Sequence, residues 1–220
     1  MKTKIFGTLL ISVLAAGVAF AAPTAQIIGG VTNVQLSSEA LQALDSQNIT
    51  PSAISPGSLQ NDRVSFPIPG GAIDLGNSRG DILHTGGLAF DSDDDNVSLF
   101  NFIISTTGRS PVLTGLAAVN DDIVNRIPLF NLQLIQALQP DEFGTIVISN
   151  VNLTLTQSGA DALNEAFGVT AFQENFLFGT AVVVAQSLET SAAQDDTEDD
   201  TEDDTEDDTE DDTEDESQPQ

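Results

Sequence analysis

Short apolar runs with alternating hydrophobic and polar positions dominate the chain beyond about residue 60. In the first run, Val64, Phe66 and Ile68 occupy every second position, so their side chains point to one face of a strand. Pro67 and Pro69 lack a backbone N–H and predict that this strand lies at the edge of a sheet. Six further β-branched or aromatic runs follow, at residues 81–90, 97–105, 112–119, 127–135, 145–156 and 176–185. Gly, Pro, Asn and Asp separate the runs, so the pattern predicts an all-β domain.

Two segments carry a helical pattern instead. Residues 38–45 place their leucines on one face. The second helix is predicted to begin at Ser158, with Asp161 three residues later as a capping box, and to end at Gly168. We therefore expect one β-sandwich-like domain, residues 22–194, with two short helices.

The first 21 residues have the pattern of an export signal. Lys2 and Lys4 precede an apolar stretch, residues 5–20, and Ala19-Phe20-Ala21 forms a small-x-small cleavage site. We expect cleavage before Ala22 and a secreted or periplasmic bacterial protein. No later apolar run reaches the roughly 18 residues of a transmembrane helix, so no membrane anchor is expected after processing.

The C-terminal residues 195–220 are a low-complexity acidic segment. Thr-Glu-Asp-Asp repeats from Thr197 onward, and residues 195–216 hold 17 of the 34 acidic side chains in the whole chain. Adjacent carboxylates repel one another, and the repeat has no apolar residue to bury. We therefore predict a disordered acidic tail.

Charge and composition exclude several classes of function. The 220 residues contain 34 Asp and Glu but only 6 Lys and Arg, which gives a net charge of −28. Both lysines lie in the export signal, so the processed chain has no lysine. Nucleic-acid binding needs clustered basic residues and is not expected. The absence of cysteine excludes disulfides, thiol nucleophiles and cysteine-ligated metals.

Two acidic segments are candidate sites for weak divalent-cation binding. The tail offers closely spaced carboxylates, at Asp195, Asp196, Glu198, Asp199, Asp200, Glu202, Asp203 and Asp204. The alternative role of the tail is to keep the chain soluble. The second choice is Asp91, Asp93 and Asp95, whose alternate spacing resembles the start of a calcium loop. That segment lacks the glycine and the distal glutamate of such a loop, and it also reads as a turn.

Candidate catalytic residues are sparse. His84 is the only histidine, and it precedes two glycines in a predicted bend. No nucleophile elbow, zinc-protease motif or second histidine accompanies it, so a hydrogen-bonded structural histidine is expected. Two carboxylates at a suitable separation could still form a hydrolase site, although the chain lacks the Trp and Tyr that usually stack on sugars.

Several segments together resemble a known group of proteins. They are Val64–Gly71 (VSFPIPGG), Gly80–Leu88 (GDILHTGGL), Val97–Phe102 (VSLFNF), Ile127–Phe130 (IPLF) and Leu153–Gly168 (LTLTQSGADALNEAFG). The combination is similar to secreted bacterial β-rich proteins that are distantly related to the haemin-uptake (HtaA-type) surface domain. The resemblance spans roughly residues 31–185 and implies a β-sandwich.

The resemblance also implies haem held through tyrosine with histidine support, but this chain has no tyrosine. Only His84 lies in a matching segment, and no role is transferred to it. The leading interpretation is therefore an exported, non-enzymatic β-rich domain with a binding or surface-structural role and no cofactor. Its partner would be an unidentified cell-surface or extracellular molecule. The alternatives are a small-ligand carrier of haem-uptake type and a carboxylate-dependent hydrolase.

Overall fold

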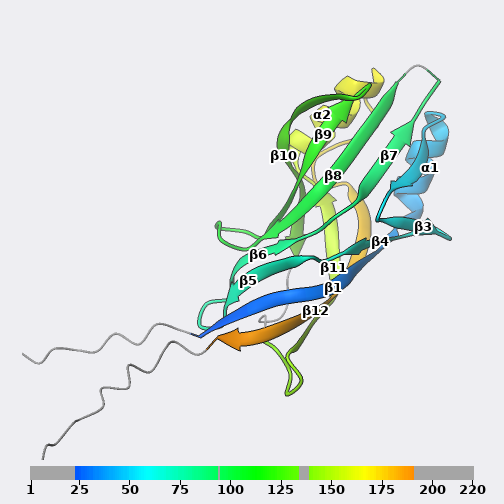
Figure 1. Ribbon diagram of the computed structural model, residues 1–220. Helices are drawn as coiled ribbons and strands as arrows, with labels where there is room; N and C mark the ends of the chain where they lie inside the picture. The colour runs from blue at the N-terminus through cyan, green and yellow to red at the C-terminus, as the bar shows by residue number, and fades with distance from the viewer. Residues whose placement is uncertain (1–22, 94, 134–138, 191–220) are drawn as a thin grey trace, which may run out of the picture.

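The computed structural model describes residues 23–93, 95–133 and 139–190 (Figure 1). Twelve strands and two helices form this part of the chain. The strands are β1 (Thr24–Leu36), β2 (Thr50–Ile54), β3 (Ser58–Gln60), β4 (Arg63–Pro67), β5 (Gly70–Asp74), β6 (Arg79–Leu83), β7 (Gly87–Asp91), β8 (Asn96–Ser105), β9 (Val112–Val119), β10 (Asp122–Gln133), β11 (Thr145–Leu155) and β12 (Leu177–Thr190). The helices are α1 (Ser38–Ser46) and α2 (Gln157–Phe167). The predicted export signal and acidic tail lie outside the described residues.

All strands belong to one antiparallel sheet that closes on itself. The order is β12-β11-β10-β9-β8-β6-β5-β1, and β1 also pairs with β12. Two pairs of strands branch from this ring, β4 with β3 from β1, and β7 with β2 from β8. The inner faces of the folded sheet pack on one hydrophobic core, which confirms the predicted all-β class with two short helices.

The longest-range pairings involve β1, which the sequence pattern did not predict. Its Thr24–Ile27 half pairs with β5 and its Val31–Gln35 half pairs with β4, while β12 runs along the other side. Gly30 has φ of +139°, and a Cβ there would meet the Val184 carbonyl oxygen at 2.2 Å. A glycine is therefore required where β1 bends against β12.

The first predicted strand has the expected inward face but the wrong position in the sheet. Val64, Phe66 and Ile68 are buried as predicted. However, β4 lies between β1 and β3, so it is not an edge strand. Pro67 is tolerated because β3 pairs with β4 only up to Ser65, so the missing N–H leaves no ladder bond unmade on that side.

The predicted strand at residues 81–90 is two strands. β6 ends at Leu83 and β7 begins at Gly87, and the connection turns the chain from the ring to its branch. Gly86 has φ of +82°, and a Cβ there would meet the Gly57 nitrogen at 2.4 Å, so the bend needs a glycine.

Side-chain capping fixes both helix starts. Ser37 accepts a hydrogen bond from the Ala40 N–H at 2.9 Å and begins α1. The predicted capping box at Ser158 is wrong, because Thr156 is the N-cap of α2 and accepts from the Gly159 N–H at 3.0 Å. The Thr156 hydroxyl also donates to the Pro128 carbonyl at 2.7 Å, which attaches the helix start to β10. α2 ends at Gly168 as predicted, with φ of +62°.

Candidate functional site

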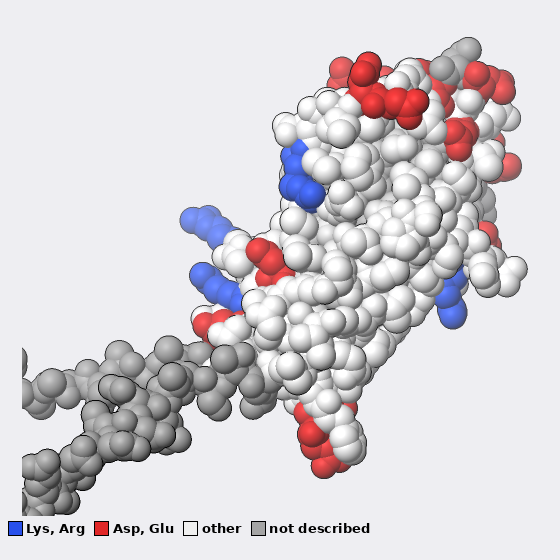
Figure 2. Space-filling view, viewed as in Figure 1, with Lys and Arg blue, Asp and Glu red and all other residues white. Residues whose placement is uncertain are grey.

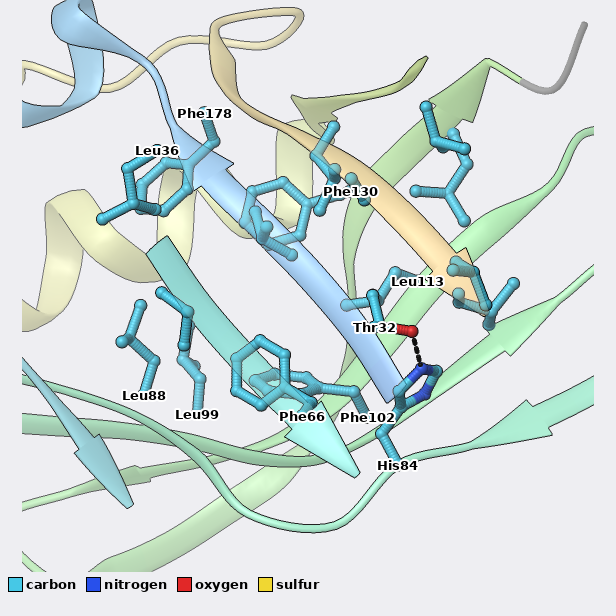
Figure 3. A pocket seen from close by; sticks show the side chains of 18 of the residues that line it. Thr32, Leu36, Phe66, His84, Leu88, Leu99, Phe102, Leu113, Phe130 and Phe178 are labelled. Carbon is cyan, nitrogen blue, oxygen red and sulfur yellow. Dashed lines mark hydrogen bonds between the residues drawn. The ribbon is translucent and has the colours of Figure 1, made fainter. Parts of the chain in front are cut away.

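His84 lies in the core beside β1. Its side chain is 4% exposed, and its Nε2 is 2.7 Å from the hydroxyl of the equally buried Thr32 (Figure 3). Its backbone N–H donates to the Phe102 carbonyl at 2.9 Å. The ring Nδ1 has no hydrogen-bond partner within the described residues. This histidine is part of the core packing and is not displayed to a ligand at the surface.

Burial makes the charged form of His84 unfavourable. Desolvation lowers the pKa of the imidazole from 6.5 to about 4, and the carbonyls of Phe102 and Ile82 oppose this shift by a smaller amount. His84 is also the only titratable residue among those that line the surrounding cavity. The imidazole is therefore neutral at physiological pH, and it is unsuited to act as an acid near neutrality.

The cavity around His84 is too small for a ligand. Its volume is about 50 Å³, whereas pockets for small molecules typically measure about 300–1,000 Å³. Phenylalanine rings line much of it, and four of them, Phe66, Phe102, Phe130 and Phe178, are labelled in Figure 3. Phe66 packs edge-on against Phe102 with ring centres 5.0 Å apart, and Phe178 contacts both Phe90 and Phe130, at 6.1 and 5.2 Å. The described residues thus leave little room for a ligand here.

A larger groove lies between α2 and one end of β8, β9 and β10. Its volume is about 600 Å³, within the range of small-molecule pockets. Ten of its fifteen lining residues are apolar: Val97, Leu99, Ala117, Val119, Val124, Ile127, Leu129, Ala162, Leu163 and Ala166. The others are Asn125, Ser158, Gly159, Asp161 and Glu165. The groove is therefore apolar along its walls, with acid groups only on α2.

Two glycines let the walls of this region approach closely. Gly159 in the first turn of α2 lies against the Leu129 backbone, where an added Cβ would be 2.5 Å from the carbonyl oxygen. Gly115 in β9 lies under the Leu129 and Phe102 side chains, where a Cβ would meet them at 2.7 and 2.8 Å. Leu99 lines both the groove and the core cavity, so the groove lies directly against the hydrophobic core.

A bulge in β10 decides which of its residues face the groove. The register with β9 shifts between Ile123 and Asn125, so the consecutive residues Val124 and Asn125 both line it. Arg126 then alternates to the other face, where its guanidinium donates to the Thr114 hydroxyl at 3.3 Å. No basic side chain in the described part of the chain lines the groove.

The acidic turn at residues 91–95 connects β7 and β8, as the turn interpretation expected. Asp91 accepts hydrogen bonds from the Asn96 amide and the Ser52 hydroxyl, and Asp95 accepts from the Asn120 amide at 3.1 Å. Within the described ranges, no group of three or more His, Cys, Asp or Glu side chains is arranged to hold a metal ion. Weak cation contact at Asp91, Asp93 and Asp95 stays a prediction, and the tail carboxylates from Asp195 onward lie outside the described residues.

Comparison with known proteins supports the fold. No protein-family model and no curated protein sequence matches the chain. Among solved structures, the C-terminal domain of HtaA from Corynebacterium glutamicum matches with a TM-score of 0.59 and 16% identity, covering 74% of this chain and 99% of that domain. This chain has the fold of the HtaA-type domains. The predicted resemblance is thereby confirmed as a distant one.

Two further structures agree with this fold. Heme binding protein HtaB from the same organism matches with a TM-score of 0.52 and 10% identity over 76% of this chain and 96% of that protein. The N-terminal domain of HtaA matches with a TM-score of 0.50 and 14% identity over 76% of this chain and 98% of that domain. These identities establish shared architecture alone. In the described part of the chain, no helix is both long and apolar enough to span a membrane.

The groove was not visible from the sequence. The sequence pattern places Asp161 in a helix cap and gives Glu165 no role, although their spacing of four residues puts both carboxylates on one face of a helix. The missing information was which strands that face would meet. The sheet order β8-β9-β10 places three separate segments next to α2, residues 97–99, 117–119 and 124–129.

Proposed function

We propose that this chain is an exported, non-catalytic domain that binds a small, mainly apolar ligand in the groove between α2 and β8–β10. The observation that carries the proposal is the groove itself, with a volume of about 600 Å³ and ten apolar lining residues. Burying a ligand there removes apolar surface from water on both partners, which is the main source of affinity for such sites.

The lining offers little for catalysis. Asp161 and Glu165 are the only titratable groups that the described residues contribute to it, and both are exposed side chains on the same face of one helix. A hydrolase of the paired-carboxylate type needs two acids whose environments differ, so that one can donate a proton while the other is ionised. Because Asp161 and Glu165 share one solvated environment, the groove favours binding over the hydrolase alternative.

A neutral fluorescent probe tests the proposal directly. N-phenyl-1-naphthylamine gains fluorescence in apolar pockets, and the chain has no tryptophan or tyrosine to interfere. We expect saturable binding with one site per chain. The variant Ala162→Trp places an indole in the groove. Because the indole occupies space that the probe needs, binding of the probe should weaken at least about tenfold. Gln42→Trp, at an exposed position on α1, is the matched control and should bind normally.

The result that contradicts the proposal is equally clear. Non-saturable fluorescence, or equal binding by Ala162→Trp and Gln42→Trp, would show that the probe does not enter this groove. Circular dichroism of both variants establishes that they are folded before the comparison is made.

Haem carriage is the second candidate, and the fold likeness to HtaA domains and to heme binding protein HtaB favours it. The side chains of this chain do not favour haem carriage. It has no tyrosine, and its one histidine is buried against Thr32, outside the residues that line the groove. We expect no stoichiometric Soret shift when haemin is added. A one-to-one complex that His84→Ala abolishes would reverse the ranking of the two functions.

A further inference from the structure

The charges around the groove set the class of ligand it prefers. Among the described residues, Asp161 and Glu165 are the only charged ones that line it, and Asp121 and Asp122 lie where the turn after β9 leads into β10. Figure 2 shows carboxylates gathered at the end of the domain that carries α2 and this turn. Arg126, the basic residue on the groove-lining part of β10, faces the other side of the sheet. The carboxylates therefore make the electrostatic potential negative at the α2 end of the groove, which favours a cationic group there and repels an anionic one.

The apolar and acidic parts of the groove are spatially separate. The walls from β8, β9 and β10 carry apolar side chains with the single exception of Asn125, whereas both carboxylates stand on α2. Their spacing of one helical turn puts the two carboxylates about 5–6 Å apart at Cβ, close enough to share one cation. Asp161 Oδ1 already accepts from the Gln157 amide at 2.7 Å. Its other oxygen and the Glu165 carboxylate make no hydrogen bond to another of the described residues, so both can accept from a ligand.

We propose that the groove binds a cationic amphiphile, with its apolar body against β8–β10 and its ammonium or amine group between Asp161 and Glu165. This inference rests on the proposed binding function and adds the charge of the ligand. Charge complementarity also decides against other occupants. A second copy of this strongly acidic chain would bring like charges together, and the anionic carboxylates of haemin would meet the same repulsion.

Three ligands of equal chain length test the charge preference. Decyltrimethylammonium and decanoate, each below its critical micelle concentration, and 1-decanol, below its solubility limit, are competed against N-phenyl-1-naphthylamine. Two partly solvated ion pairs should make the cation bind about tenfold more tightly than the alcohol at low ionic strength, and decanoate more weakly than either. High salt should remove the difference and leave 1-decanol binding unchanged or stronger.

The double variant Asp161→Asn, Glu165→Gln removes both charges while keeping the shape of the side chains. It should reduce the preference for the cation over 1-decanol to about twofold or less, and this ratio is the quantity compared. The matched control is Glu39→Gln, Asp45→Asn on α1, which makes the same change in net charge away from the groove. The control should keep the full preference.

Each other outcome overturns the inference in a recognisable way. Equal binding of all three ligands leaves the binding function standing and refutes the cationic preference. Loss of preference in the α1 control would assign it to net charge alone. Probe binding that weakens as protein concentration rises, together with dimers in sedimentation, would identify a second copy as the occupant. Absence of any competition, with no saturable probe binding, refutes the binding function itself.

Discussion

The burial of His84 predicts a specific pH dependence of stability. The pKa of the imidazole is about 4 in the folded protein and about 6.5 when it is solvated. Above both values the ring is neutral in either state, so His84 contributes no pH dependence there. As the pH falls from 6.5 to 4, the unfolded chain binds a proton that the folded protein rejects, and the free energy of unfolding decreases.

The size of the effect follows from the two pKa values. Each pKa unit corresponds to about 1.4 kcal/mol, so a difference of about 2.5 units removes about 3 kcal/mol of stability by pH 4. This is a large fraction of the roughly 5–15 kcal/mol that stabilises an ordinary domain. Asp141 acts in the same direction, but at lower pH, because the Thr145 and Phe143 N–H groups lower its pKa. Its stabilising contribution is lost only as the pH falls through that lowered pKa.

Two measurements isolate the histidine. Urea unfolding followed by far-ultraviolet circular dichroism gives the slope of stability against pH for the wild type and for His84→Gln. The variant should be less stable near neutrality, and it should lack the decline between about pH 6.5 and pH 4.5. Because the chain has one histidine, its imidazole NMR signal is unambiguous. A folded-state titration near pH 6.5, or the same pH slope in the variant, would refute the reasoning.

Three further predictions concern the core, α2 and the tail. Phe178→Ala should destabilise the domain by about 3–5 kcal/mol, because the buried ring contacts two other phenylalanines; equilibrium unfolding in urea checks this. Gly159→Ala should lower the thermal midpoint despite its gain in helix propensity, since the new methyl group would lie 2.5 Å from a backbone oxygen; an unchanged or raised midpoint would contradict the contact. Removing residues 195–220 should leave the thermal midpoint unchanged, or raise it at low salt. It should also abolish most calcium binding, which we expect at about millimolar affinity in calorimetry. Equal calcium uptake by chains ending at Gln194 and Gln220 would place the cation site in the body, with the turn at residues 91–95 the first suspect.

Local patterns in the sequence were sufficient for the class of fold. Alternation at Val64, Phe66 and Ile68 identified an inward strand face because a strand directs successive side chains to opposite sides, whatever its neighbours are. Gly168 marked the end of α2 because a left-handed residue costs least at glycine. These features depend on residues close together in the chain, so the sequence alone contains them.

Tertiary contacts decided the rest. β1 has two glycines and several polar residues at its centre, and it is extended because three other strands pair with it. The start of α2 moved to Thr156 because Pro128 offers its hydroxyl a hydrogen-bond acceptor from β10. β6 and β7 both pair with β8, but their other neighbours differ, β5 for β6 and β2 for β7, and the turn at His84 separates the two halves of that run.

The candidate site depends on tertiary structure in the same way. Its apolar walls look like ordinary core positions in the sequence, and its two carboxylates look like solvated helix residues. Only the sheet order, the β10 bulge and the close approach of Gly159 to Leu129 bring them around one groove. Periodicity tells which face of an element avoids water, but the partner of that face is set by pairings between residues far apart in the chain, which no local pattern encodes.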